Sequence, residues 1–149
     1  MGMGVSFTDK QFKDLLLLAY LGEWVLSAHK ENPGGALGDL ISHLYSHAGS
    51  FGLGSLSERG TSGKGHFPSR AMEETAQEYL EDYDNDTFWE ELLQRMAERD
   101  FVAAHGEAAI KAMPERERQD KLDEFQRKYQ QEFEEHGLDR LALRGDVPA

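Results

Sequence analysis

The chain of 149 residues contains no cysteine. Disulfide frameworks, thiolate zinc sites, iron–sulfur clusters and cysteine nucleophiles are therefore excluded. The longest apolar run, residues 15–26, is interrupted by Glu23 and is too short for a bilayer, which takes about 20 residues. The N-terminus also lacks the basic region of a secretory signal. We expect a cytoplasmic protein that does not contact a membrane.

Basic residues are missing from the stretch between Arg70 and Arg95. Such a segment repels phosphate backbones and attracts cations or basic protein surfaces, so direct binding of nucleic acid is disfavoured. The formal net charge of the chain is −12, and this stretch carries most of it through nine acidic residues: Glu73, Glu74, Glu78, Glu81, Asp82, Asp84, Asp86, Glu90 and Glu91.

The hydrophobic pattern predicts one all-α domain over residues 1–149, a bundle of about five helices. A first helix begins after Thr8, which forms a capping box with Gln11, while Phe7 and Phe12 occupy the positions of a hydrophobic staple. The helix runs to about residue 30 and is apolar on two sides, so we expect it at the centre of the core. No segment alternates convincingly with the period of a strand.

A second helix covers residues 37–48, after a stop signal at residues 32–35. Residues 49–68 contain six glycines and four serines, so we expect a mobile loop between the second and third helices. Residues 138–149 form a C-terminal tail. The side chains expected to point inward from the second helix are Leu37, Leu40, Ile41 and Leu44.

Three more helices follow the loop. Thr87 and Glu90 form a second capping box, which predicts a helix start there, with the acidic residues 82–86 as the break before it. Glycine and proline mark the remaining boundaries. We expect a third helix from about residue 69 to that break, a fourth over residues 87–105, a short turn or helix over 107–113 and a fifth over 114–136.

Asp82, Asp84 and Asp86 match the opening D-x-[DN]-x-[DN] of an EF-hand loop. The sixth position, which needs glycine, is Thr87, and the twelfth, which needs a bidentate carboxylate, is Leu93. An EF-hand is therefore excluded. Capping of the next helix is the simpler interpretation of these acids.

His43 and His47 lie at i, i+4 on the second helix, a spacing that presents two imidazoles to one metal ion. The glutamate of H-E-x-x-H is missing, and no third ligand is identifiable by spacing. Surface histidines are the favoured interpretation, so we expect no cofactor. A metal-dependent enzyme is the alternative.

Arg99 and His105 form an R-x5-H pattern with Asp100 after the arginine. The pattern resembles the short signature of the HEPN ribonucleases, which are also all-α and of similar size. The resemblance covers seven residues and implies that the arginine and the histidine act at the scissile phosphate of RNA. Arg59 and His66 also fit the spacings that this signature permits, and an RNA substrate fits an acidic protein poorly. A ribonuclease is a second enzymatic alternative.

Other catalytic templates fail. Gly63-Lys64 is not a Walker A loop, because Glu58 stands at the position of its first glycine and Gly65 at that of its Ser or Thr. No G-x-S-x-G elbow exists.

We therefore favour a non-catalytic interaction protein. An acidic, aromatic-rich surface on the third and fourth helices would bind a basic protein partner or a second copy of the chain. A DNA-mimic inhibitor, in which carboxylates imitate phosphates, is a further alternative. An exposed tryptophan would anchor a partner. The residues expected at this surface are Glu81, Asp82, Tyr83, Asp84, Asp86 and Trp89.

Overall fold

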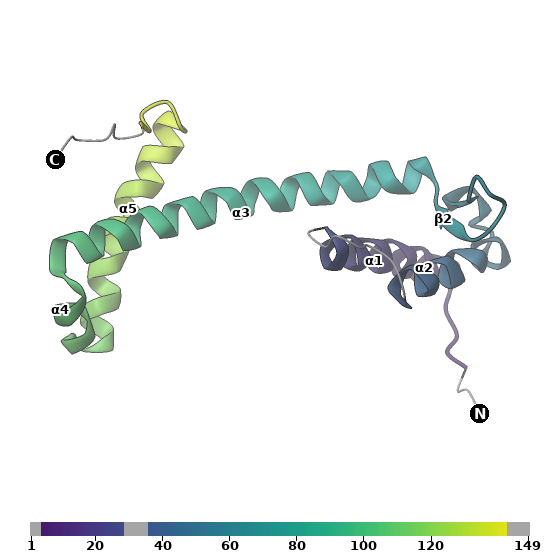
Figure 1. The fold of residues 1–149 in the computed structure, drawn as a ribbon, viewed down its shortest axis with the longest axis horizontal. Coiled ribbons are helices and arrows are strands. Elements are labelled where there is room, and N and C mark those ends of the chain that lie inside the picture. The colour runs from purple at the N-terminus through teal and green to yellow at the C-terminus, as the bar shows by residue number, and fades with distance from the viewer. Residues whose placement is uncertain (1–3, 29–35, 143–149) are drawn as a thin grey trace. The chain divides into compact units, whose positions relative to one another are not determined.

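The computed structural model describes residues 4–28 and 36–142 (Figure 1). These ranges contain five α-helices, two short 3₁₀ helices and one two-stranded sheet, which confirms the mainly helical class. The chain divides into two compact units, Met1–Tyr83 and Asp84–Ala149, and the single-domain organisation stays a prediction. None of the helices in the described ranges combines the length and apolar character of a membrane span. The α-helices are α1 (Asp9–Ser27), α2 (Ala36–Ser46), α3 (Arg70–His105), α4 (Glu107–Ala112) and α5 (Glu115–His136).

The start of α1 follows the sequence prediction. The Thr8 side chain accepts a hydrogen bond from the Gln11 backbone, and the Gln11 side chain accepts one from the Thr8 backbone. The rings of Phe7 and Phe12 lie 6.1 Å apart, as a hydrophobic staple requires. The predicted end near residue 30 and the stop signal at residues 32–35 lie outside the described residues.

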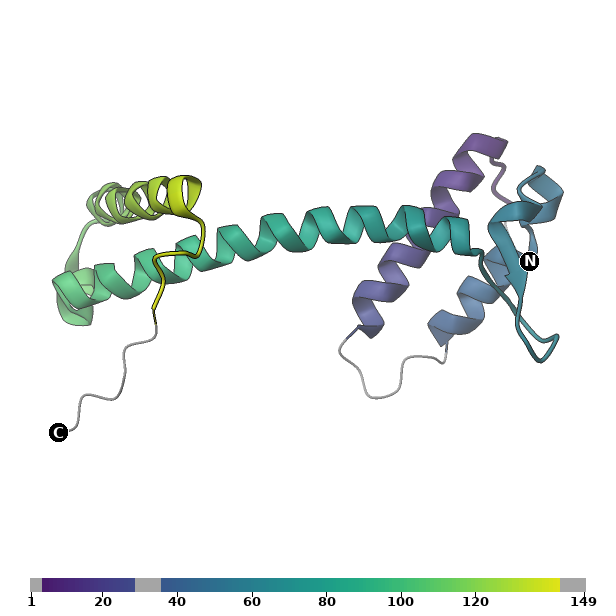
Figure 2. The same ribbon diagram turned by 90° about the horizontal axis from the view of Figure 1, so that it is seen from above.

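The core of the first unit lies where α1 and α2 run side by side and the first turn of α3 covers them (Figure 2). Tyr45 was missed by the sequence pattern, yet it is fully buried and its hydroxyl donates to the Leu16 carbonyl over 3.0 Å. Leu37 and Leu40 are 40% and 51% exposed, so their predicted inward position is wrong. The buried residues of this core cluster are Phe12, Leu16, Ile41, Tyr45, Ala48 and Met72.

The prediction that α1 is covered on both apolar sides is also wrong. Only Phe12 and Leu16 of this helix are buried, whereas Leu18, Val25 and Leu26 are exposed. Leu17 and Leu21, which lie on the same side as Leu18, are half-buried, so this side of α1 is covered only in part.

Residues 49–68 connect α2 and α3, but they have regular structure. They contain the end of one 3₁₀ helix (Ala48–Phe51), a second 3₁₀ helix (Gly54–Leu56), and strands β1 (Ser57–Arg59) and β2 (His66–Pro68), which pair antiparallel. This short hairpin was not indicated by the sequence, in which no segment alternates convincingly with the period of a strand.

Three contacts hold this connection on the helices. The backbone N–H of His66 donates to the Ser42 hydroxyl over 2.9 Å, and the ring of Phe51 stacks on Phe12 at 4.0 Å. The N–H of Ser69 donates to the Leu56 carbonyl over 2.9 Å. The glycine and serine content of residues 49–68 cannot predict these contacts, because they depend on residues outside the segment.

Helix α3 is continuous from Arg70 to His105, so the predicted break at residues 82–86 and the second helix start at Thr87 are wrong. The physical reason is that the whole span lacks glycine and proline. Aspartate, asparagine and threonine cost at most about 0.7 kcal/mol each inside a helix, and the surrounding Glu, Gln, Leu and Ala residues favour helix. Thr87, which could cap a helix start, therefore lies inside α3.

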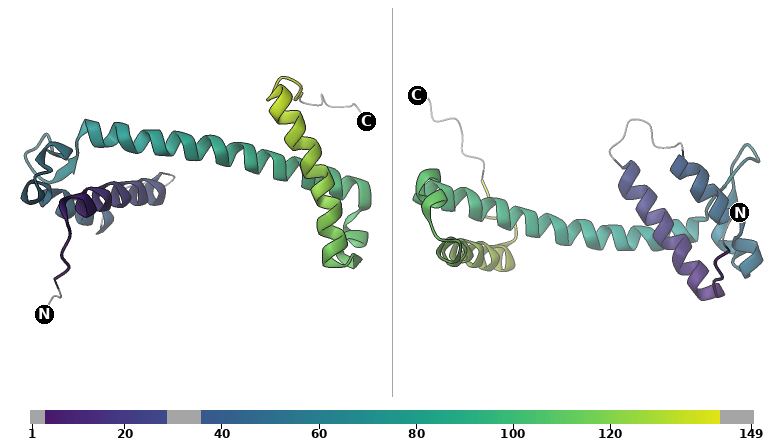
Figure 3. Two further views of the ribbon diagram at one scale, coloured as in Figure 1. Left: turned by 180° about the vertical axis from the view of Figure 1, so that it is seen from behind. Right: turned by 90° about the horizontal axis from the view of Figure 1, so that it is seen from below.

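In the second unit, α4 reverses the chain and α5 packs across the C-terminal part of α3 (Figure 3). Aromatic pairs line this contact: Trp89 with Phe133 at 5.7 Å and Phe101 with Phe125 at 6.0 Å between ring centroids. Ala97 and Phe101 are the buried residues on the α3 side. The predicted short helix before Pro114 is confirmed as α4.

Candidate functional site

The acidic residues of α3 wrap around the helix and do not gather at one corner. Residues 81–86 are all exposed. At 3.6 residues per turn, Asp82 and Asp86 lie on the same side, whereas Asp84 is about 200° around the helix from both and Glu81 is about 100° from Asp82. The four predicted carboxylates therefore do not form a single face.

A different set of acids forms a continuous row along α3, since five carboxylates follow one another at i, i+4 and each lies about 40° further around the helix than the one before. We call these residues the carboxylate ridge: Glu74, Glu78, Asp82, Asp86 and Glu90. All five are exposed. At its start Arg70 pairs with Glu74 at 2.8 Å. Like charges at this spacing destabilise a helix by roughly 0.2–0.5 kcal/mol per pair, so the ridge weakens α3 unless cations neutralise it.

Aromatic side chains are interspersed with the ridge residues along α3. Tyr79 is 58% exposed, Tyr83 is 64% exposed and Phe88 is 48% exposed. Trp89 is half-buried, because its ring contacts Phe133 at 5.7 Å and Phe88 at 5.1 Å. Exposed tyrosines beside carboxylates are well suited to contact a protein partner.

An open groove of about 530 Å³ lies between α3 and α5 in the second unit. Its polar lining includes a hydrogen bond of 2.9 Å from the Gln130 side chain to Glu134. Sequence reasoning missed this groove, although one signal was present: in a hairpin of two helices around α4, Trp89 and Phe133 stand at similar chain distances from the turn. The lining residues are Trp89, Glu90, Leu93, Gln130, Phe133 and Glu134.

Arg99, Asp100 and Tyr129 form a polar cluster across the same helix pair. The Arg99 guanidinium lies 2.7 Å from the Asp100 carboxylate and donates to the Tyr129 hydroxyl over 3.1 Å. The Tyr129 hydroxyl in turn donates to Asp100. This last hydrogen bond lowers the pKa of Asp100, with help from Arg99 and against the effect of desolvation. Burial, followed by Asp100, raises the pKa of Tyr129.

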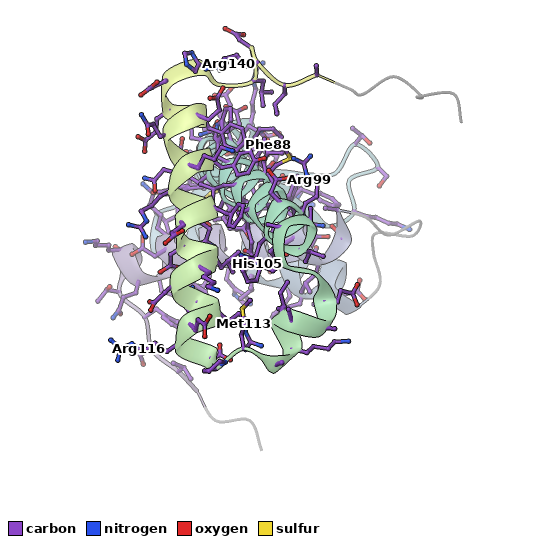
Figure 4. The ribbon with its side chains drawn as sticks, turned by 90° about the vertical axis from the view of Figure 1, so that its left-hand side faces the viewer. Phe88, Arg99, His105, Met113, Arg116 and Arg140 are labelled. Carbon is purple, nitrogen blue, oxygen red and sulfur yellow. The ribbon has the colours of Figure 1, made fainter. Side chains whose placement is uncertain are left out.

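The structure does not bring Arg99 and His105 together at one site (Figure 4). The Arg99 guanidinium is engaged by Asp100 and Tyr129. The His105 ring instead lies edge-on to Phe101 at 5.0 Å and to Phe125 at 6.4 Å. A half-buried imidazole among aromatic rings packs the helix pair, and the geometry gives no support to joint action on a phosphate.

His43 lies on α2 and His47 just after its end, with ring centroids 4.8 Å apart in an edge-to-face arrangement. Both are exposed. Within residues 4–28 and 36–142, no group of three or more histidine and carboxylate side chains is placed to hold a metal ion.

Comparison with known proteins yields no family model, no curated protein and no solved structure that matches this chain.

Proposed function

We propose that this protein is a non-catalytic interaction protein that uses the carboxylate ridge of α3 to bind a basic segment of a partner protein. One observation carries the proposal: five exposed carboxylates follow one another at i, i+4 on a single helix that contains no basic residue between Arg70 and Arg95. A cationic partner would remove the repulsion along the ridge, so the helix gains stability on binding.

The ridge differs from an ordinary solvated helix face. On α5, the acidic Glu117 pairs with Lys121 at 2.9 Å, one turn away, and Glu115 pairs with Arg118. Along the ridge, the described cations reach only its first member, through Arg70. Negative charge of this kind steers a basic partner into contact, and salt screens the attraction.

A matched pair of variants tests the proposal. Glu78→Gln/Asp82→Asn/Asp86→Asn removes three charges from the ridge, and Glu73→Gln/Asp84→Asn/Glu91→Gln removes three from the opposite side of the same helix. We expect the ridge variant to bind a fluorescent octa-arginine peptide about tenfold more weakly than the native chain at low salt, a loss of about 1.4 kcal/mol. Equal weakening by both variants would show that only overall charge matters and would refute the proposal.

A second surface favours self-association. Leu18 and Val25 are 67% and 59% exposed on the solvent side of α1, and a second copy that covered them would bury apolar area on both chains. We propose that two chains pair through this side of α1. Sedimentation equilibrium should show a dimer that Leu18→Gln/Val25→Gln abolishes; a monomer at every concentration would exclude it.

A further inference from the structure

The groove between α3 and α5 combines an aromatic lining with carboxylates. Trp89, Leu93 and Phe133 supply its apolar surface, and Glu90 and Glu134 supply negative charge. Among the residues that the structure describes, no lysine or arginine lines it. Its volume of about 530 Å³ falls in the range of about 300–1,000 Å³ typical of ligand sites.

We propose that this groove holds an arginine side chain of the basic partner segment, with its guanidinium stacked on Trp89 and paired with Glu90 and Glu134. The inference rests on the proposed function and adds to it a specific binding site. A tryptophan ring is the strongest aromatic partner for a cation. A carboxylate beside it accepts two parallel hydrogen bonds from a guanidinium.

Arginine suits this lining better than lysine does. The guanidinium is planar and weakly hydrated, so it stacks on an indole and still donates at its edges, whereas an ammonium is compact and strongly hydrated. Glu134 is already held in place by the hydrogen bond from Gln130. The Trp89 ring is held by an edge-to-face contact with Phe88 and a tilted contact with Phe133. Both contact groups are therefore positioned before a ligand arrives, which lowers the entropic cost of binding.

The charge around the groove matches only a cationic occupant. Asp86 lies one helical turn before Glu90 on α3 and is exposed, so a second cation of the same segment would meet a second carboxylate. Within the described residues, Arg140, six positions after Glu134, pairs instead with Glu132 at 3.2 Å. An acidic or neutral peptide would leave these carboxylates without a partner.

Trp89 itself reports on the site. The chain has two tryptophans, so Trp24→Phe makes Trp89 the sole emitter in the full-length protein. We expect octa-arginine amide to change the Trp89 emission to a saturable end point. Octa-lysine amide of equal charge should bind with at most half of that emission change, because it does not stack on the ring.

Two exposed carboxylates provide the decisive variant. In the Trp24→Phe background, Glu90→Gln/Glu134→Gln should weaken octa-arginine binding about tenfold, as expected for lost charge-assisted hydrogen bonds. The control Asp120→Asn/Glu124→Gln on α5 changes the charge equally and should weaken binding less than about twofold. Circular dichroism checks that all variants are folded.

The outcomes separate this inference from the proposed function. Peptide binding without a change in Trp89 emission, or equal weakening by both double variants, overturns the groove site while the carboxylate ridge remains. Binding that is insensitive to the ridge variant but lost in Glu90→Gln/Glu134→Gln overturns the ridge and supports the groove. Trp89 emission that depends on protein concentration without peptide assigns the groove to a second copy and overturns the arginine site.

Discussion

The hydroxyl of Tyr45 on α2 donates a hydrogen bond of 3.0 Å to the backbone carbonyl of Leu16 on α1, and both side chains are fully buried. This contact joins two helices that are 29 positions apart at these residues. We predict that Tyr45→Phe, which keeps the ring and removes the hydroxyl, lowers the free energy of unfolding by about 1 kcal/mol. Urea unfolding measures this change, and an unchanged midpoint and slope would show that the hydrogen bond contributes nothing.

The same tyrosine makes the stability of the fold depend on pH in the alkaline range. Burial raises the pKa of Tyr45 above its ordinary value of 10.0, and the charges of Tyr20 and Glu73 raise it further. The folded state therefore keeps its proton while the unfolded chain releases it. The contribution to stability is complete below about pH 10 and is lost as the pH rises above that value. We predict that native stability falls above pH 10 and that Tyr45→Phe shows a shallower fall in unfolding experiments from pH 8 to 11.

The local signals at the start of α1 were sufficient to predict it, because Thr8 and Gln11 interact only with each other. Tyr45 shows what such signals miss. Tyr45 is buried because α2 packs against α1. The hydroxyl of a tyrosine on a short helix gives no local signal that its hydrogen-bond acceptor is Leu16, 29 positions earlier in the sequence. The break predicted at residues 82–86 failed for a different reason. Thr87 and Glu90 match a capping box, which predicts a helix start. A helix without glycine or proline nevertheless continues through such residues, because each costs at most about 0.7 kcal/mol inside a helix.

The sequence predicts which acidic and aromatic residues belong to the candidate site, but not how they are arranged around α3. The acids and aromatics of α3 can be identified from the sequence, but their predicted grouping depends on a helix break at residues 82–86. In the continuous helix, Asp84 lies nearly opposite Asp82. The groove could not be predicted without knowing that α3 packs against α5. Phe133 and Glu134 come to Trp89 only because α4 reverses the chain, and helix pairing is a long-range property.

Continuity of α3 predicts opposite responses to two substitutions at the exposed Asn85. Asn85→Pro should cost about 3 kcal/mol locally, because proline removes a helical hydrogen bond and clashes with the preceding turn. Asn85→Ala should stabilise the helix by up to about 0.7 kcal/mol. Residue-resolved amide exchange over residues 82–89 should speed up with proline and slow down with alanine. Equal exchange in the native and proline forms would mean that the helix is broken there.

The Arg99, Asp100 and Tyr129 cluster predicts an acid limit for the second unit. The hydrogen bond from Tyr129 holds the pKa of Asp100 below its ordinary value of 3.8. A carboxyl of this kind stabilises the fold above pH 3.8, and the contribution is lost as the pH falls through the lowered pKa. We predict that Tyr129→Phe moves the pKa of Asp100 upward in an NMR titration and makes the loss of stability between pH 5 and 2 shallower. Tyr79→Phe, at an exposed tyrosine, is the control and should change neither.

The carboxylate ridge predicts that one substitution raises stability while it lowers binding. Asp82→Lys converts two repulsive i, i+4 contacts, with Glu78 and with Asp86, into attractive ones, which should stabilise α3 by about 1 kcal/mol at low salt. The gain in stability should largely disappear in 1 M NaCl, where the Debye length is about 3 Å and the charges are screened from one another. The same change should weaken octa-arginine binding about tenfold, since it places a cation in the middle of the ridge.

The control for this prediction is Asp84→Lys, which alters the net charge equally. Its i, i+4 neighbours are Leu80 and Phe88, so it gains no ion pair at that spacing, and we expect a smaller change in both stability and binding. Thermal unfolding at low and high salt measures stability, and fluorescence anisotropy measures binding. A ridge that serves only as a solvated helix face would give Asp82→Lys the gain in stability without the selective loss of binding. That result would separate helix electrostatics from partner recognition and leave the interaction hypothesis without its main support.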